Sequence, residues 1–458
     1  MTTFFDSEHK LFHALNNNPN DQGNIGVRTM VKHVEHEKTV YDVLAERGFI
    51  EKVTDEEKVP EILKKRKVTC YIGFDPTASS FHVGSLVPIM ALAHMQRHGH
   101  RPIALVGGGT GLVGDPSGKD EMRQILTYDE IAKNAEIQKK QFAQFLDFSE
   151  GRALLLNNAD WLTKLNYIEF LRDFGIHFSV NRMLATESVK IRLETGLSFI
   201  EFNYQLLQAY DFWYQFKHYD CLIQMGGSDQ WGNIVAGIDL IRRLEGEQAY
   251  GITFPLIMTA DGRKMGKTEK GAVWLDPGKT SPYEYYQFWI NTDDRDIKRF
   301  LALFTFLPMK EVEEYGRFEG QEIRKAKEVL AYEATKIVHG EEEAKKARNA
   351  SRDIFGRSDI PSTHIKEEGG QLLDDDSIPT AYVPVEKSDQ QIPAFKLFHE
   401  ITGLCASGSE ARRLIEQGGA YINDKKVEKF DAPIRVEDNM KLRAGKKKFK
   451  RIKILDKR

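Results

Sequence analysis

The chain of 458 residues is long enough for two or three domains, each with its own hydrophobic core. It is 41% hydrophobic and 29% charged, which excludes a largely disordered chain, and no apolar run reaches the roughly 20 residues of a membrane-spanning helix. The amino terminus lacks a secretory signal pattern, and three scattered cysteines form no disulfide or zinc framework. We therefore expect a cytoplasmic protein with no membrane partner and no protein-bound metal.

The formal charge of −3 hides an asymmetry between the body of the chain and its tail. Residues 392–458 hold 17 Lys and Arg against 9 Asp and Glu, a balance of +8, which leaves −11 for residues 1–391. A basic segment at the end of an acidic body favours a polyanionic partner that is met at the carboxyl end.

Strand-like and helical segments alternate through the first half of the chain. After a polar extension, a helix is expected from about residue 39 to 55. Further strands are expected at 68–74, 101–106, 154–156 and 221–225, and further helices at 85–98, 128–148 and 195–217. Strand, glycine turn and helix in repetition predict an α/β fold with a doubly wound, Rossmann-like parallel sheet.

The later part of the chain changes in composition. Residues 282–355 have a purely helical texture, and a linker with acidic residues and proline separates them from the basic tail. The predicted organisation is an extension without assigned function (1–37), a Rossmann-like catalytic domain (38–260), an all-helical domain (261–357), a linker (358–391) and a small basic domain (392–458).

A short motif near the start of a predicted helix is suited to binding phosphate. In His82-Val-Gly84 an imidazole and a glycine stand where unpaired N–H groups and the helix dipole favour an anion. Gly84 weakens a helix unless something must approach the backbone closely, and Thr77 adds a hydroxyl just upstream. Considered without its neighbours, His82 is equally consistent with a histidine that caps a helix or is partly buried.

A second motif, about 180 residues later, carries the matching positive charge. Lys264-Met-Gly-Lys267-Thr268 places two ammonium groups on a glycine-containing loop, which by itself also fits an exposed basic turn. Lys119 and Arg123 supply two more cations after a glycine-rich turn. Together the two motifs suggest nucleotide activation in which pyrophosphate leaves.

Polar residues also gather where a small ligand could bind. Tyr204, Gln208 and Asp211 have the spacing that places them on one face of a helix, where they suit a zwitterionic or hydroxyl-bearing ligand unless that face is solvated. The segment 226–232 directly follows a strand, and ligands of open α/β sheets bind at the carboxyl ends of strands. An acid there, such as Asp229, commonly holds ribose hydroxyls.

The run Gly109-Thr-Gly111-Leu-Val-Gly114 follows a strand and fits the dinucleotide fingerprint, so an NAD enzyme is an alternative. However, Asp115-Pro-Ser keeps the chain turning where a helix should open, and no second strand ends in an acid about 20 residues later. A Walker loop fails, because Val113 replaces its first glycine and Asp120 follows Lys119. A tight structural turn is the third interpretation.

Taken together, these motifs resemble bacterial-type tyrosyl-tRNA synthetases, which are class I aminoacyl-tRNA synthetases. The matching segments are 71–77, 82–84, 114–119, 204–211, 226–233 and 264–268, in order along the chain. Residues 408–415 and 421–426 resemble the S4 RNA-binding domain, a small α+β domain that ends these enzymes.

The resemblance implies a ligase that makes tyrosyl-AMP from L-tyrosine and ATP, with Mg²⁺ carried by the nucleotide, and then acylates tRNA(Tyr). It implies a homodimer formed through a helical segment inserted at about 120–200. An RNA-binding protein with an idle active site, such as an RNA chaperone, is the alternative from another class. Intact Asp115, Asp211, His82 and Lys264 argue against idleness.

The same resemblance assigns roles to individual residues. Tyrosine binding falls to Tyr71, Asp75, Asp115, Tyr204, Gln208, Asp211 and Gln230. ATP binding falls to Gly84, Gly227, Asp229 and Lys267. Phosphate chemistry falls to Thr77, His82, Gly84, Lys119, Arg123, Lys264, Lys267 and Thr268, and RNA binding to Arg412, Arg413, Lys425 and Lys426. Ser85 departs from the family, which usually has a second His or an Asn there.

Overall fold

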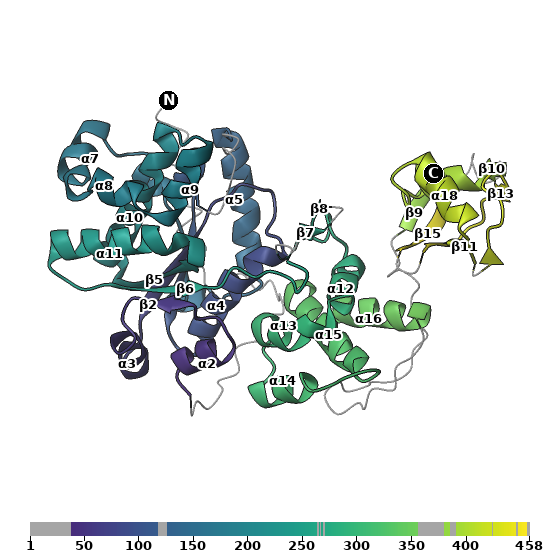
Figure 1. The fold of residues 1–458 in the computed structure, drawn as a ribbon, viewed down its shortest axis with the longest axis horizontal. Coiled ribbons are helices and arrows are strands. Elements are labelled where there is room, and N and C mark those ends of the chain that lie inside the picture. Colours follow the sequence, from purple (N-terminus) through teal and green to yellow (C-terminus); the bar gives the residue numbers. More distant parts are fainter. Residues whose placement is uncertain are drawn as a thin grey trace. The chain divides into compact units, whose positions relative to one another are not determined.

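The computed structural model describes residues 38–117, 126–262, 265, 267–268, 271–355, 380–384, 391–423, 425–445 and 448–455. The described residues form two compact units (Figure 1). The first unit lies within Met1–Thr280 and Phe288–Gly340, and the second lies within Ser281–Gln287 and Glu341–Arg458.

The first unit is built on a six-stranded sheet with the strand order β1-β6-β5-β2-β3-β4. The strands are β1 (Lys52–Val53), β2 (Thr69–Phe74), β3 (Arg101–Val106), β4 (Leu154–Asn157), β5 (Cys221–Gly227) and β6 (Tyr250–Phe254). All neighbours from β6 to β4 are parallel, and the short edge strand β1 runs antiparallel to β6. The predicted doubly wound parallel sheet is confirmed, whereas β1 and β6 were not predicted.

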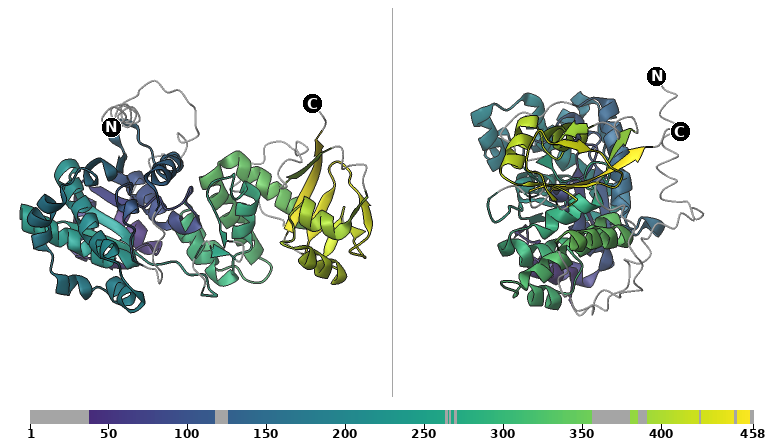
Figure 2. Two further views of the ribbon diagram at one scale, coloured as in Figure 1. Left: turned by 90° about the horizontal axis from the view of Figure 1, so that it is seen from above. Right: turned by 90° about the vertical axis from the view of Figure 1, so that its right-hand side faces the viewer.

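Helices cover both faces of this sheet (Figures 1 and 2). The covering helices are α4 (Leu86–Arg97), α5 (Tyr128–Phe142), α10 (Phe199–Tyr219) and α11 (Trp231–Glu245). Parallel crossovers are right-handed, so α4 and α5 cover one face while α10 and α11, reached after the strand order reverses, cover the other. The reversal lies between β2 and β5, and the carboxyl ends of these two strands are where such sheets bind ligands.

The predicted single helix at 39–55 is wrong. It is replaced by α2 (Val40–Glu46), the strand β1 and α3 (Lys58–Lys65). Thr39 and Asp42 form a capping box at the start of α2, and Gly48, with φ +82°, turns the chain directly after it.

Two other helices have different ends from those predicted. α10 begins at Phe199 rather than 195, because Ser198 accepts a hydrogen bond from the Glu201 N–H and Gly196 has φ +99°. α5 ends at Phe142 rather than near residue 148.

The remaining elements of the first unit are short or helical. They are α6 (Ala159–Leu162), α7 (Tyr167–Asp173), α8 (Val180–Leu184), α9 (Glu187–Thr195), β7 (Lys267–Thr268), β8 (Gly271–Ala272), α13 (Ile297–Phe304), α14 (Met309–Tyr315) and α15 (Ile323–His339). α12 (Pro282–Ile290) contributes residues to both units, and α16 (Glu341–Phe355) belongs to the second. The helical texture predicted for 282–355 is confirmed.

The second unit ends in a small β-rich body with a core around Leu397, Phe398, Leu442 and Ile452. A five-stranded sheet has the order β12-β11-β14-β15-β9, and β10 pairs with β13. The elements are β9 (Thr380–Pro384), β10 (Gln391–Pro393), α17 (Ala394–Lys396), α18 (Gly408–Glu416), β11 (Ala420–Ile422), β12 (Lys425–Lys426), β13 (Pro433–Arg435), β14 (Lys441–Ala444) and β15 (Lys448–Leu455). Among the described helices of both units, none has the length and apolarity needed to cross a bilayer.

Candidate functional site

A cavity of about 410 Å³ opens at the carboxyl ends of β2 and β5, where the strand order reverses. Most of the predicted site residues line it, although they come from segments that are far apart in the sequence. The lining includes Tyr71, Asp75, Thr77, Gly84, Asp115, Tyr204, Gln208, Asp211, Gly227, Asp229 and Gln230.

One part of the cavity presents a buried hydroxyl and a buried carboxylate. The Tyr71 side chain is 1% exposed, and its hydroxyl has no hydrogen-bond partner among the described residues. Both oxygens of Asp211 are held, since Asn158 Nδ2 donates to one at 2.8 Å and Trp161 Nε1 to the other at 2.7 Å. Burial raises the pKa of Asp211 to about 7 and that of Tyr71 well above its usual value. A phenol donor paired with an anionic acceptor complements a ligand hydroxyl, which can accept from one and donate to the other.

Asn158 and Trp161 are two residues of this candidate site that the sequence analysis did not single out. Asn158 follows β4 directly and lines the cavity, whereas Trp161 lies in the next element, α6. The rule applied to the segment 226–232, that ligands bind at the carboxyl ends of parallel strands, would have found Asn158 but not Trp161. Their hydrogen bonds fix the orientation of Asp211.

A second polar cluster lies in the same cavity around two other carboxylates. Asp75 accepts hydrogen bonds from Thr110 Oγ1 at 2.7 Å and from the Tyr204 hydroxyl at 3.0 Å. Asp115 accepts from the Ser117 N–H at 2.9 Å and from Gln230 Nε2 at 2.7 Å, and burial raises its pKa to about 6. The four donors named here are neutral groups, and a pair of carboxylates suits a ligand ammonium group.

The first phosphate motif has the geometry that its sequence predicts. His82 is the N-cap of a short 3₁₀ helix, Val83–Ser85, which leads into α4, and its Nδ1 accepts a hydrogen bond from the Gly84 N–H at 2.9 Å. In the neutral ring the proton therefore lies on Nε2. A Cβ on Gly84 would lie 2.7 Å from the His82 ring and 3.1 Å from the Met265 carbonyl oxygen, so only glycine fits.

The second motif reaches the first one through its backbone. Met265 is buried and donates its N–H to the Ile257 carbonyl at 3.0 Å, which brings its own carbonyl against Gly84. The chain after the motif then pairs with the first motif, since the Val83 N–H donates to Val273 O at 2.9 Å. Lys119, Arg123 and Lys264 lie outside the described residues, and Lys267 and Thr268 are described as the strand β7 only.

The glycine turn after β3 is explained by close packing. A Cβ on Gly107 would lie 2.1 Å from Asp75 Oδ1, and one on Gly108 would lie 2.3 Å from Asn157 Oδ1. The turn is followed by a single 3₁₀ turn, Thr110–Leu112, where a dinucleotide fingerprint requires a full helix. This contradicts the NAD alternative and supports the interpretation as a structural turn.

We expect Gly107→Ala to lower the free energy of unfolding by about 1–3 kcal/mol, because the new methyl group overpacks the site against Asp75. Gly73→Ala is the matched control from the same cavity, since its nearest neighbour would be Leu105 at 3.9 Å. Urea denaturation of both variants checks the prediction. Equal losses of stability in the two variants would contradict it.

Comparison with known proteins agrees with this geometry. Residues 63–356 match the family described as tRNA synthetases class I (W and Y). The chain belongs to this family. A tyrosine–tRNA ligase of Syntrophus aciditrophicus is 59% identical over 428 residues, which cover 91% of this chain and 99% of that protein. A tyrosine–tRNA ligase of Desulfatibacillum aliphaticivorans is 57% identical with the same coverage.

A solved structure supports the fold of this class I tRNA synthetase. A C-terminally truncated mitochondrial tyrosyl-tRNA synthetase of Aspergillus nidulans is 33% identical and superimposes with a TM-score of 0.63. The match covers 69% of this chain and 94% of that one.

The predicted RNA-binding residues of this synthetase lie on the small β-rich body of the second unit. Arg412 and Arg413 are exposed on α18, and the Arg412 guanidinium stacks over Phe395 at 4.2 Å. Lys425 and Lys426 are exposed on β12. All four cations therefore stand on short elements of the same body.

Proposed function

We propose that this class I tRNA synthetase is a tyrosine–tRNA ligase. It joins L-tyrosine to ATP to form tyrosyl-AMP and pyrophosphate, and then transfers the tyrosyl group to the terminal adenosine of tRNA(Tyr). The main observation in favour of tyrosine as the amino acid is that the unpartnered Tyr71 hydroxyl and the Asp211 carboxylate line the same cavity. Relatives named tyrosine–tRNA ligase at 57–59% identity support it.

Tyrosine binds in this proposal with its phenol at Tyr71 and Asp211 and its ammonium group at the second cluster. The phenol accepts from the Tyr71 hydroxyl, which otherwise lacks a partner, and donates to the Asp211 carboxylate, which Asn158 and Trp161 hold in place. The ammonium group lies beside Asp75 and Asp115, with Tyr204 and Gln208 as further partners. Gln230 orients the carboxylate, which is the nucleophile of the first step.

ATP binds in this proposal across the carboxyl ends of β5 and β2. Its ribose hydroxyls bind Asp229. A Cβ on the nearby Gly227 would lie 2.5 Å from Asp229 Oδ1 and would keep the ligand from approaching the backbone. Its phosphates meet the Gly84 N-terminal turn, with Thr77 and His82 as donors. The charge of the leaving group is neutralised by Lys119, Arg123, Lys264, Lys267 and Thr268 and by Mg²⁺, which arrives with ATP.

The chemistry follows from this placement. The tyrosine carboxylate forms a new oxygen–phosphorus bond at the α-phosphate, and the bond to the bridging oxygen breaks to release pyrophosphate. The carboxylate is already ionised, so no protein base is required, and catalysis consists of positioning and charge stabilisation. Amino-acid-dependent ATP–pyrophosphate exchange with all twenty amino acids tests the proposal. Exchange should depend on tyrosine alone, and exchange driven by tryptophan instead would contradict it.

Tyrosine affinity should rise with pH, because the carboxylates that receive the ligand are partly protonated in the empty cavity. Burial raises the pKa of Asp211 to about 7 and that of Asp115 to about 6. Between pH 5.5 and 8 we expect the affinity to increase about 100-fold, with protons released on binding. Calorimetry in buffers of different ionisation enthalpy measures both quantities. A dissociation constant that is unchanged over this range would refute the assignment.

The same two pKa shifts set the sign of a stability change in the empty protein. Each acid has a higher pKa folded than unfolded, so its contribution to stability is complete below about pH 4 and is lost as the pH rises through about 7. In the Asp211→Asn variant, the free energy of unfolding should therefore fall less steeply as the pH approaches 7.

The basic tail is proposed to be an S4 RNA-binding domain that holds tRNA. Deleting residues 392–458 should leave tyrosine-dependent exchange intact but reduce tRNA charging severely, because +8 of charge is removed from the polyanion contact. The dependence of tRNA affinity on salt should also flatten. Loss of exchange together with charging, or an unchanged salt dependence, would contradict this role.

A homodimer is proposed from the inserted helical segment at about 120–200. Large apolar side chains are exposed there, including Ile168 at 69%, Ile176 at 74% and Phe199 at 71%. Apolar side chains gathered in one segment favour burial against a second copy of the chain. Sedimentation equilibrium should therefore give twice the mass of the chain, and substituting Ile168 and Ile176 by Lys should give a monomer.

A further inference from the structure

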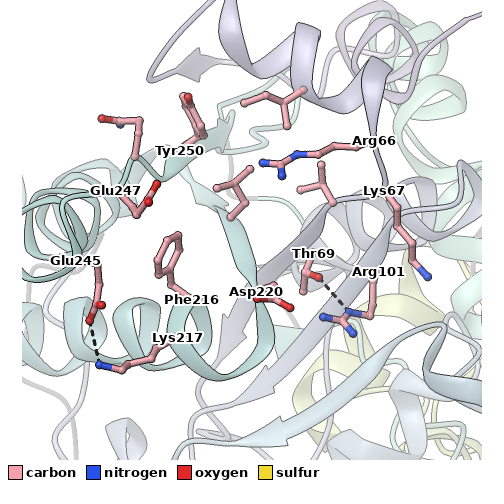
Figure 3. Close-up of a pocket in the computed structure, with 14 residues that line it drawn as sticks. Arg66, Lys67, Thr69, Arg101, Phe216, Lys217, Asp220, Glu245, Glu247 and Tyr250 are labelled. Atoms are coloured by element: carbon pink, nitrogen blue, oxygen red, sulfur yellow. Dashed lines mark hydrogen bonds and ion pairs between the residues drawn. The ribbon is translucent and has the colours of Figure 1, made fainter.

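A second hollow lies at the opposite edge of the parallel sheet from the catalytic cavity (Figure 3). It forms where β2, β3, β5 and β6 begin and where α3, α10 and α11 end, and it shares no lining residue with the catalytic cavity. Its volume of about 820 Å³ is within the range of roughly 300–1,000 Å³ typical of small-molecule sites.

One side of the hollow is basic. Arg66 directly follows α3, Lys67 precedes β2, and both side chains are exposed. Arg101 opens β3, where its Nε donates to Thr69 Oγ1 at 3.0 Å and its Nη2 donates to the Tyr219 carbonyl at 2.6 Å. Figure 3 shows Arg66 and Arg101 on the same side of the hollow, so an anion that enters the hollow is attracted toward this side.

The rest of the lining carries carboxylates. Glu247 lies in the turn between α11 and β6, and Figure 3 shows it on the side opposite Arg66. Asp220 ends α10 in the left-handed conformation, with φ 54°. A third acid, Glu245, is already engaged by Lys217 at 3.2 Å and by Trp213 Nε1 at 2.7 Å.

Apart from the Lys217–Glu245 pair, four charged side chains of this hollow do not pair with one another. Within the part of the chain that the structure describes, the side chains of Arg66, Lys67, Asp220 and Glu247 have neither a hydrogen bond nor an ion pair. The ring of Phe216 supplies a flat apolar surface among them. A ligand that brings a strong anion to one side and hydrogen-bond donors to the other satisfies both sets of groups.

We propose that this hollow binds a nucleoside 5′-monophosphate. The phosphate, a dianion near neutral pH, is held by Arg66, Lys67 and Arg101. The ribose hydroxyls donate to Asp220 or Glu247, and the base stacks on Phe216. A nucleic-acid backbone would bring several phosphates against the two carboxylates, whereas a mononucleotide brings one phosphate only.

Calorimetry on the full chain tests this proposal, with AMP, GMP, CMP and UMP as separate probes. The catalytic cavity is first filled with a non-hydrolysable tyrosyl-adenylate analogue, so that any further heat reports another site. We expect one added site for at least one nucleotide, weakened at least 10-fold by Arg66→Ala and several-fold by Glu247→Gln. Lys64→Ala is the matched control, because Lys64 is an exposed cation on α3 outside the hollow, and it should leave binding unchanged.

Several outcomes would overturn the proposal. They are no added site for any nucleotide, binding that Arg66→Ala leaves unchanged, or inorganic phosphate binding as tightly as the nucleotides. Arg66 and Glu247 are exposed, so the variants should fold, and tyrosine-dependent exchange provides a check of this. Failure of the analogue to bind in the first titration would instead count against the proposed ligase function, which keeps the two results apart.

Discussion

Replacing His82 by Ala should lower the rate of tyrosyl-AMP formation by about 10²–10³-fold while the affinity for tyrosine hardly changes. His82 stands at the N-terminal turn that we propose faces the phosphates, beside Gly84, where a Cβ would lie 2.7 Å from the imidazole ring. The proposed phenol site is built from different elements, which are the middle of β2 and the middle of α10. Stopped-flow measurement of adenylate formation, together with equilibrium binding of tyrosine, separates the two effects.

His82→Asn is the control that separates catalysis from helix capping. Asn is a good N-cap residue and can accept the Gly84 N–H as the imidazole Nδ1 does, so the turn should remain intact. If the imidazole acts on phosphate, His82→Asn should fold like the wild type and recover only part of the rate. A full recovery would show that His82 serves as a cap, and a large loss of tyrosine affinity in either variant would contradict its assignment to phosphate.

Asp211→Asn should reduce kcat/KM for tyrosine by about 10³-fold and narrow the preference for tyrosine over phenylalanine. The wild-type carboxylate accepts from both Asn158 and Trp161, and in the proposed complex it also accepts the hydrogen bond that the phenol donates. An amide in its place must turn its NH₂ group toward one of these two donors, so a buried hydrogen bond is lost and the charge disappears. The ratio of tyrosine-dependent to phenylalanine-dependent exchange measures the change.

Two further variants make this result interpretable. Asp160→Asn removes an exposed carboxylate two residues after Asn158, outside the cavity lining, and should leave both rates unchanged. Tyr71→Phe conserves volume and removes only the hydroxyl that lacks a partner, so it should relax rejection of phenylalanine with little change in stability. Unchanged selectivity in both Asp211→Asn and Tyr71→Phe would place phenol recognition elsewhere.

The sequence predicted the parts of the fold that depend on local pattern and chain order. Strands β2, β3 and β5 were predicted because buried parallel strands have nearly continuous apolar sequences, and these are followed by Asp75-Pro76 after β2 and by glycine after the apolar runs of β3 and β5. β1 and β6 were missed, because β1 is a two-residue edge strand and β6 has no helix after it to complete the repeating pattern. The helix expected at 39–55 failed because the turn at Gly48 outweighed its amphipathic spacing.

The sequence predicted those parts of the candidate site whose residues share one helix or strand. Tyr204 and Asp211 share a helix face, so spacing was enough to bring them to one cavity. The packing of the glycine turn was not predictable, because Gly107 is required by Asp75, directly after β2, and Gly108 by Asn157 at the end of β4. Such contacts depend on the register between β2, β3 and β4, which local sequence does not specify.

A crystal structure with a non-hydrolysable tyrosyl-adenylate analogue is the decisive test of the proposed ligand placement. We predict that the phenol oxygen lies within hydrogen-bond distance of both the Tyr71 hydroxyl and Asp211, and that the phosphoryl group, at the other end of the ligand, lies beside the Gly84 turn. A phenol oxygen bound away from Asp211, or a phosphoryl group remote from Gly84, would contradict it.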